Sequence, residues 1–168
     1  MAELALVRLD DRLIHGQVLV SLLKVVGSKK IIIVDDKIVN DKFQTTILKA
    51  VCPKDQAFEI MDTDQVAKSF QEEQLGSVGP ILAIYKDVDN LYRSYQKGFK
   101  FDKLQIGGAR TTTHGDGRKQ IGNNQVFFNK EEADMLEEMA NDGVEISIRQ
   151  TPQAQPIEWK SAYARYFK

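Results

Sequence analysis

A nucleophile and its charged neighbours stand together near the start of the chain. His15 follows Asp10, Asp11 and Arg12 closely and is itself followed by Gly16. Neutral imidazole is a good nucleophile near neutral pH, and a guanidinium binds phosphoryl oxygens through a planar fork of donors. Asp10 or Asp11 could fix the imidazole tautomer or hold Arg12 in place. These residue types predict phosphoryl transfer through His15, and their alternative interpretation is a solvated or helix-capping cluster.

The elements around this segment place the histidine directly before a helix. Leu4–Leu9 is predicted to be a strand and Val18–Val26 a helix, so His15 lies in the loop that joins them. The free N–H groups and the positive end of that helix favour an anion. Gly16 has no side chain and allows the backbone to approach a phosphoryl group closely. Gly16 and Gln17 are therefore predicted, with Arg12, to stabilise the phosphoryl group.

Short apolar runs alternate with amphipathic stretches along the whole chain. The predicted strands are Leu4–Leu9, Ile31–Val34, Phe58–Met61, Pro80–Tyr85, Lys103–Ile106, Val126–Phe128 and Val144–Ile148. The predicted helices are Val18–Val26, Asp41–Val51, Thr63–Glu73, Asp87–Lys97, Lys130–Asn141 and Glu158–Phe167. Continuous apolar strands are typical of burial on both faces, and their alternation with helices indicates parallel crossovers. The fold class is therefore α/β, with a single doubly wound, mostly parallel β-sheet and helices on both faces.

The size and charge of the chain limit the classes of function. Its 168 residues, 42% hydrophobic and 28% charged, suit one globular domain over residues 1–168. A formal net charge of -1 offers no broad attraction for nucleic acid. No apolar run approaches the roughly 20 residues of a membrane span, and no signal peptide is recognised, so a cytoplasmic location is expected. The glycine patterns of dinucleotide and P-loop sites are absent.

A second loop is expected beside the histidine. Ligands of doubly wound sheets bind beyond the carboxyl ends of the strands, near a switch point. We expect the strand Lys103–Ile106 beside the first strand, on the side opposite the strand that begins near Pro80. Gly107 and Gly108 would then let the backbone pass close to the phosphoryl group, and Arg110 would add positive charge. The alternative is that the glycines only turn the chain and Arg110 points into solvent. For His114, in the same loop, both a solvated side chain and a second base stay open.

The segment around the histidine resembles a family signature. Asp10–Val18 is similar to the signature of the mannose/fructose/sorbose family of phosphotransferase enzyme IIB. Four later segments resemble further parts of that family in the same order, so the similarity runs over nearly the whole chain. They are Ile31–Asp36 with Asn40-Asp41, Gly107-Gly108, Gly117–Ile121 and Gly143–Gln150.

The resemblance implies a reaction and a set of partners. Enzyme IIA, phosphorylated by HPr, would pass its phosphoryl group to His15, on Nδ1 as in the family. IIB would then phosphorylate a sugar as the membrane subunits IIC and IID bring it in. No cofactor is implied, neither metal nor nucleotide, and no nucleic acid is expected as a partner. The protein would be cytoplasmic, held at the inner face of the membrane through IIC and IID. The identity of the sugar and the oligomeric state are not predicted.

Two other classes of function were weighed. A regulatory protein of the same fold would bind HPr or IIA without phosphorylating sugar, but the presence of His15 and Arg12 favours a working carrier. Asp35 and Asp36 follow a buried strand, like the acidic pair of a response-regulator receiver domain. A receiver has a further aspartate after its third strand and a later lysine. Here the third strand ends at Met61-Asp62 with no clear acidic pocket, and no lysine follows the strand Lys103–Ile106. Asp35 and Asp36 are therefore interpreted as loop and capping residues.

Overall fold

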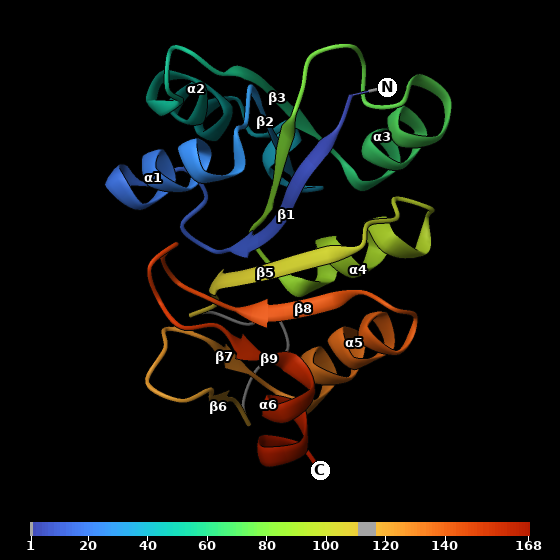
Figure 1. Ribbon diagram of the computed structural model, residues 1–168. Helices are drawn as coiled ribbons and strands as arrows, with labels where there is room; N and C mark the ends of the chain where they lie inside the picture. Colours follow the sequence, from blue (N-terminus) through green and yellow to red (C-terminus); the bar gives the residue numbers. More distant parts are fainter. Residues whose placement is uncertain (1, 111–116) are drawn as a thin grey trace.

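The computed structural model describes residues 2–110 and 117–168 and contains a seven-stranded sheet (Figure 1). The strand order is β3-β2-β4-β1-β5-β8-β9. Neighbouring strands are parallel except β9, which pairs antiparallel with β8. The strands are β1 (Leu4–Asp10), β2 (Lys30–Val34), β3 (Ala57–Met61), β4 (Ile81–Tyr85), β5 (Lys103–Gly108), β8 (Glu145–Ile148) and β9 (Ile157–Glu158).

Helices pack on both faces of the sheet. They are α1 (Gly16–Val26), α2 (Lys42–Val51), α3 (Thr63–Lys68), α4 (Val88–Gln96), α5 (Lys130–Asn141) and α6 (Trp159–Tyr166), with a 3-10 turn η1 (Ile38–Asn40) and a π-helical turn η2 (Ser69–Glu73). Leucines of α1 and α2 share one core cluster with Ile31 and Ile33. Apolar residues of α3, α4, α5 and α6 share the other cluster with Ile32 and Val34. Alternate residues of one strand thus face opposite cores, as the predicted doubly wound α/β fold requires.

Most predicted boundaries agree with the structure within two residues, and the differences are local. The helix predicted over Thr63–Glu73 is α3 followed by the turn η2. Gly107 and Gly108 are the last two residues of β5, whereas the predicted strand stops at Ile106. Two short strands, β6 (Lys119–Gln120) and β7 (Phe127–Phe128), form a separate ribbon.

Polar side chains begin several helices as the sequence indicates. Asp41 accepts a hydrogen bond from the backbone N–H of Gln44 at 3.0 Å and caps α2. Asp62 accepts from the backbone N–H of Gln65 at 2.7 Å and caps α3. Each cap satisfies a donor that the helix itself leaves free.

The first strand lies at the switch point of the sheet. β4 pairs with one edge of β1 and β5 with the other, so the predicted positions of β4 and β5 on either side of β1 are confirmed. Leu9 lies opposite Tyr85 on β4, and Asp10 lies opposite Gly108 on β5. β4 and β5 follow one another in the sequence but lie on opposite sides of β1. The loop after β1 therefore opens at the place where such sheets bind ligands.

Candidate functional site

Asp10 is the centre of the polar cluster at the carboxyl end of β1. Its side chain is only 1% exposed, but five polar groups of the protein contact its two oxygens. Arg12 donates from Nε to Oδ1 at 2.9 Å and from Nη2 to Oδ2 at 2.8 Å. Its backbone N–H also donates to Oδ1, at 3.2 Å. A buried carboxylate can stay ionised here because charged and neutral donors replace its water shell.

The loop after β1 makes a tight turn before the helix. The backbone N–H of Leu13 donates to the Asp10 carbonyl at 3.0 Å. Leu13 has a φ of 57°, in the left-handed region that residues with a side chain rarely adopt. Its side chain is buried in the core beneath α1. Burial of Leu13 below the turn and the bonds to Asp10 above it hold the strained backbone in place.

His15 occupies the position just before the first turn of α1. Its extended backbone makes it the N-terminal cap residue, although its side chain does not bond to the helix. Instead Nε2 lies 3.2 Å from Asp10 Oδ2, and 19% of the side chain is exposed. When Nε2 carries the proton and donates it to Asp10, Nδ1 keeps its lone pair as a nucleophile.

The charges of the cluster bias Asp10 toward its ionised form. Burial alone would raise the pKa of the Asp10 carboxyl, but hydrogen bonds from His15 and Arg12, with the charge of Arg8, hold that pKa well below its usual range. The hydrogen bond to Asp10 in turn raises the pKa of the Arg12 guanidinium. Asp10 is therefore ionised at neutral pH and available to orient both His15 and Arg12.

Arg8 is a member of the site to which the sequence analysis assigned no role. It is 2% exposed and donates from Nη2 to Asp10 Oδ2 at 3.2 Å. It also donates to the carbonyls of Arg149 at 3.2 Å and Gln150 at 2.8 Å, and to the Gln105 side chain. Arg8 thus joins β1, β5 and the exit of β8 beneath Asp10. The sequence does carry a signal for this role, because Arg8 lies two residues before Asp10 in an apolar strand and so shares its face of the strand.

The two glycines of β5 make room for these charged side chains. A Cβ atom on Gly107 would overlap the Arg8 guanidinium. A Cβ atom on Gly108 would lie 2.8 Å from Arg110 Nη1 and 3.1 Å from Asp10 Oδ1. Neither glycine is therefore a simple turn residue, because each allows the β5 backbone to pass directly beside the cluster.

The second loop approaches the cluster through an ion pair. Asp11 accepts from the backbone N–H of Arg110 at 2.7 Å and from its guanidinium. The backbone N–H of Asp11 donates to the Gly108 carbonyl at 3.1 Å. The described residues of the second loop therefore lie against the loop that carries His15. His114 lies outside the described residues.

Gly16 and Gln17 form the first turn of α1 and are exposed. Gly16 has a φ of 40°, a conformation that glycine adopts without strain. The cluster contains three arginines and two aspartates, so positive charge is in excess. The arginines are Arg8, Arg12 and Arg110, and the aspartates are Asp10 and Asp11. The surroundings of His15 consequently suit an added anion.

The acidic pair after β2 belongs to a separate network. Asp35 accepts at 2.9 Å from the backbone N–H groups of Lys37 and Ile38, where η1 begins. Asp36 accepts from Thr63 and from Nε of Arg93, at 3.1 Å in the latter case. These contacts confirm loop and capping roles and link the start of α3 to the last turn of α4.

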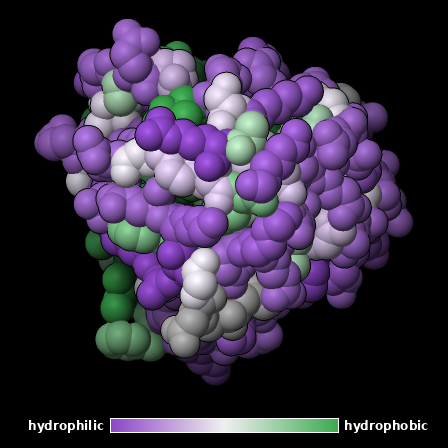
Figure 2. All heavy atoms as spheres, turned by 90° about the horizontal axis from the view of Figure 1, so that it is seen from below, coloured by the Kyte–Doolittle hydropathy of each residue, from purple (hydrophilic) through white to green (hydrophobic). Residues whose placement is uncertain are grey.

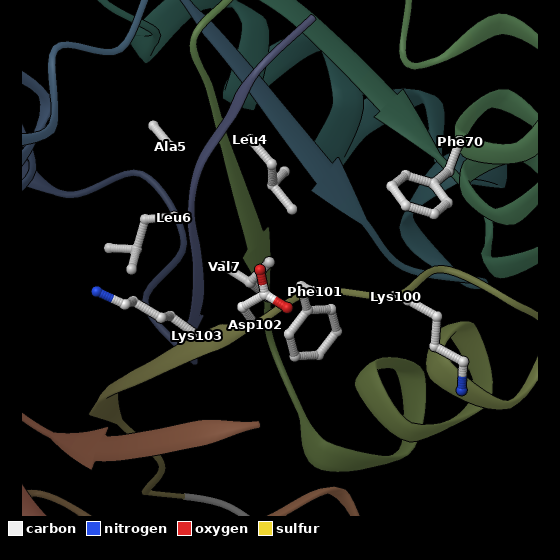
Figure 3. A pocket seen from close by; sticks show the side chains of 9 residues that line it. All are labelled: Leu4, Ala5, Leu6, Val7, Phe70, Lys100, Phe101, Asp102 and Lys103. Atoms are coloured by element: carbon white, nitrogen blue, oxygen red, sulfur yellow. The ribbon is translucent and has the colours of Figure 1, made fainter. Parts of the chain in front are cut away.

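A cavity of about 450 Å³ lies near the amino ends of the strands, at the opposite end of β1 from His15 (Figure 3). It is lined by residues 4–7 of β1, by Phe70 and by residues 100–103. Because these residues lie at the amino ends of β1 and β5, the length of β1 separates the cavity from His15.

Comparisons with known proteins agree along the whole chain. A family model described as "PTS system sorbose subfamily IIB component" matches residues 4–166. The fructose-specific EIIB component of Bacillus subtilis (strain 168) is 28% identical over 152 residues, covering 90% of each chain. The sorbose-specific EIIB component of Klebsiella pneumoniae is 24% identical over 147 residues, covering 88% of this chain and 87% of that one.

Solved structures have the same architecture. The crystal structure of manxB from Thermoanaerobacter tengcongensis superposes with a TM-score of 0.88 at 25% identity, covering 100% of this chain and 99% of that one. The IIBSor domain of the sorbose permease from Klebsiella pneumoniae gives a TM-score of 0.85 at 22% identity, covering 97% of each chain. The second likeness concerns the fold alone.

Proposed function

The chain belongs to the sorbose subfamily of phosphotransferase-system IIB components, and we propose that His15 carries the phosphoryl group in its sugar phosphotransferase reaction. The contact between Asp10 Oδ2 and His15 Nε2 is the observation that carries this proposal. It reserves Nε2 for a proton and leaves Nδ1 as the nucleophilic atom. Residues 1–168 would act as one IIB domain.

The transfer consists of two substitutions at phosphorus. Nδ1 of His15 attacks the phosphorus of a donor phosphohistidine on enzyme IIA, and the donor's P–N bond breaks. The phosphorylated His15 ring keeps its Nε2 proton and gains positive charge, which ionised Asp10 stabilises. A sugar hydroxyl then attacks the phosphorus and releases its proton to solvent, and the electron pair of the broken P–N bond returns to Nδ1. Positioning and charge stabilisation suffice, because the transition state is loose.

Cationic and backbone donors would hold the phosphoryl oxygens. Only Nε and Nη2 of Arg12 are engaged by Asp10, and among the described residues no bond occupies Nη1. The N–H groups at the start of α1, from Gly16 and Gln17, would add backbone donors directly after His15. Asp11 orients Arg110, which would add charge from the second loop.

The proposed partners follow from the family. Enzyme IIA would be the donor, and the membrane subunits IIC and IID would supply the sugar. The protein would then work in the cytoplasm at the inner face of the membrane. No helix among residues 2–110 and 117–168 is long and apolar enough to cross a bilayer.

Reconstitution of the reaction tests the proposal. The chain is incubated with phosphoenolpyruvate, enzyme I, HPr and its IIA, and then with membranes containing IIC and IID and a sugar. We expect phosphate on the wild-type chain and, after the membranes are added, sugar phosphate. Phosphorylation without any onward transfer to sugar would instead favour the regulatory protein of the same fold.

A further inference from the structure

Exposed apolar side chains gather on two helices. Among the described residues six large apolar side chains are exposed, and five of them lie on α1 or α2. The five are Val20, Val25, Phe43, Ile47 and Val51, and the sixth is Val78. Seen from below, hydrophobic atoms gather at the left edge of a mostly hydrophilic face, the side on which α1 and α2 lie in Figure 1 (Figure 2). Such clustering marks an interaction surface, whereas single exposed apolar residues need no explanation.

The apolar stripe of α2 points away from the protein. Phe43, Ile47 and Val51 are spaced four residues apart and therefore share one side of the helix. Phe43 is 75% exposed, and Leu48 is the buried residue of α2. A surface helix normally turns its apolar side toward the core, so the outward stripe serves no packing role in this chain.

Positive charge surrounds the stripe. Residues 42–54 contain Lys42, Lys49 and Lys54 and no acidic residue, in a chain whose net charge is -1, and they are flanked by Asp41, which caps α2, and by Asp55. All three lysines are exposed, and within the part of the chain that the structure describes none of them forms a salt bridge. Lys24 of α1 adds a further charge where it lines a groove of about 260 Å³ with Val20 and Pro53.

We propose that this α1–α2 face, defined by Val20, Val25 and the α2 stripe with their surrounding lysines, binds an anionic lipid surface. The stripe would enter the boundary between headgroups and acyl chains while the lysines contact lipid phosphates. Lysine is depleted at protein–protein interfaces, whereas each lysine near an anionic bilayer adds attraction, so the unpaired lysines favour lipid over a protein partner. Without a spanning helix among the described residues, the contact is interfacial.

This contact would also orient the phosphoryl-transfer site. α1 begins at Gly16, immediately after His15, so the histidine lies at one end of the proposed lipid-binding face. The carboxyl edge of the sheet would then stay beside membrane subunits embedded in the same bilayer. This orientation rests on the proposed function. The lipid contact itself rests only on the exposed apolar side chains and lysines of the α1–α2 face.

Vesicle sedimentation tests the apolar part of the contact. The full chain is mixed with vesicles of phosphatidylcholine and phosphatidylglycerol, or of phosphatidylcholine alone. We expect binding to the anionic vesicles and little to the neutral ones. Phe43→Ser with Ile47→Ser should weaken that binding at least about tenfold, since the loss of one well-inserted apolar side chain already has that effect. Val78→Ser removes an exposed valine elsewhere and is the matched control, which should bind like the wild type.

A second pair of variants tests the charge. Lys42→Glu with Lys49→Glu should abolish binding to anionic vesicles, whereas Lys160→Glu, on α6, should not. All variants alter exposed side chains, so their melting temperatures should match the wild type, and phosphorylation of His15 by IIA without vesicles should be unchanged. The proposal is overturned if the wild type binds neither vesicle, or if both double variants bind like the wild type. It is also overturned if Phe43→Ser with Ile47→Ser keeps its binding to anionic vesicles and loses only IIA binding or self-association.

Discussion

At the scale of single residues, one carboxylate connects the proposed nucleophile to two of the three arginines of the site. Asp10 contacts Arg8, Arg12 and His15, and all three contacts converge within its two oxygens. The sequence placed two aspartates before Arg12 and could not choose between them. The structure distinguishes them, because Asp10 ends a buried strand and faces His15, whereas Asp11 turns to Arg110.

Removal of the Asp10 charge should lower the stability of the folded protein. At pH 7, Asp10→Asn should lower the free energy of unfolding by about 3 kcal/mol, because Arg8 then stays buried without its counter-charge. The folded-state pKa of Asp10 lies below its unfolded value. The wild-type advantage is therefore complete above the unfolded pKa and should shrink as pH falls below about 4.

Urea unfolding at several pH values measures this difference. Asp134→Asn is the control, because Asp134 is exposed, forms an ion pair with Lys130 and accepts from the Tyr163 hydroxyl at 2.8 Å, so its substitution should cost no more than about 1 kcal/mol. A stability difference between wild type and Asp10→Asn that does not change between pH 7 and pH 3 would show that the Asp10 charge is not held as the contacts indicate.

Arg12 should be sensitive to a change that preserves its charge. Arg12→Lys replaces two directed bonds to Asp10 with one point charge and removes the nitrogen proposed to contact phosphate. Loss of such a charge-assisted contact should slow phosphoryl transfer from IIA roughly ten- to hundredfold. Rapid-quench transfer kinetics measure the rate, and near-normal kinetics in Arg12→Lys would rule out this role.

At the scale of elements, the strand-loop-helix unit β1–α1 depends on its neighbour β5. The backbone of β5 can lie beside Asp10 only because positions 107 and 108 carry no side chains. The sequence predicts these glycines beside a phosphoryl group. Their observed neighbours are the guanidinium of Arg8, for Gly107, and the side chains of Arg110 and Asp10, for Gly108.

A pair of substitutions tests the fit between β1 and β5. Gly107→Ala should destabilise the protein by about 1–3 kcal/mol, the usual cost of overpacking, because the new methyl group overlaps Arg8. In an Arg8→Ala background the same change should cost much less, since the overlapping group is gone. Unfolding free energies of the two single variants and the double variant give the coupling. Simple additivity would mean that Gly107 is not required by Arg8.

The elements differ in how far the sequence could predict them. Long apolar runs such as Ile31–Val34 and capped helices such as Lys130–Asn141 have strong periodic signals, and both were predicted almost to the residue. β6 and β9 have two residues each and carry no such signal. The position of β5 followed from topology, but the role of Arg8 depends on contacts with β5 and β8 that lie 97 or more residues away.

At the scale of the whole molecule, one imidazole must meet two partners. The proposed site opens at the carboxyl edge of β1, and both IIA and the membrane subunits must bring phosphorus or sugar to Nδ1 of His15. We therefore expect the two partners to compete for this edge. Increasing amounts of IIA should displace the chain from membranes that contain IIC and IID, while membranes without those subunits serve as the control for direct lipid binding. Isolation of a stable complex with IIA and IIC/IID bound to one chain would contradict this.

Two-dimensional nitrogen NMR of the phosphorylated chain tests the proposed mechanism most directly. The chain contains only two histidines, so each ring can be assigned with His15→Ala and His114→Ala. After incubation with phosphoenolpyruvate, enzyme I, HPr and IIA, we expect the phosphoryl group on Nδ1 of His15 and a proton on Nε2. His114→Ala should be phosphorylated like the wild type, and His15→Ala should not be phosphorylated. Phosphate on Nε2 of His15, or phosphorylation that persists in His15→Ala, would contradict the role assigned to Asp10 and His15.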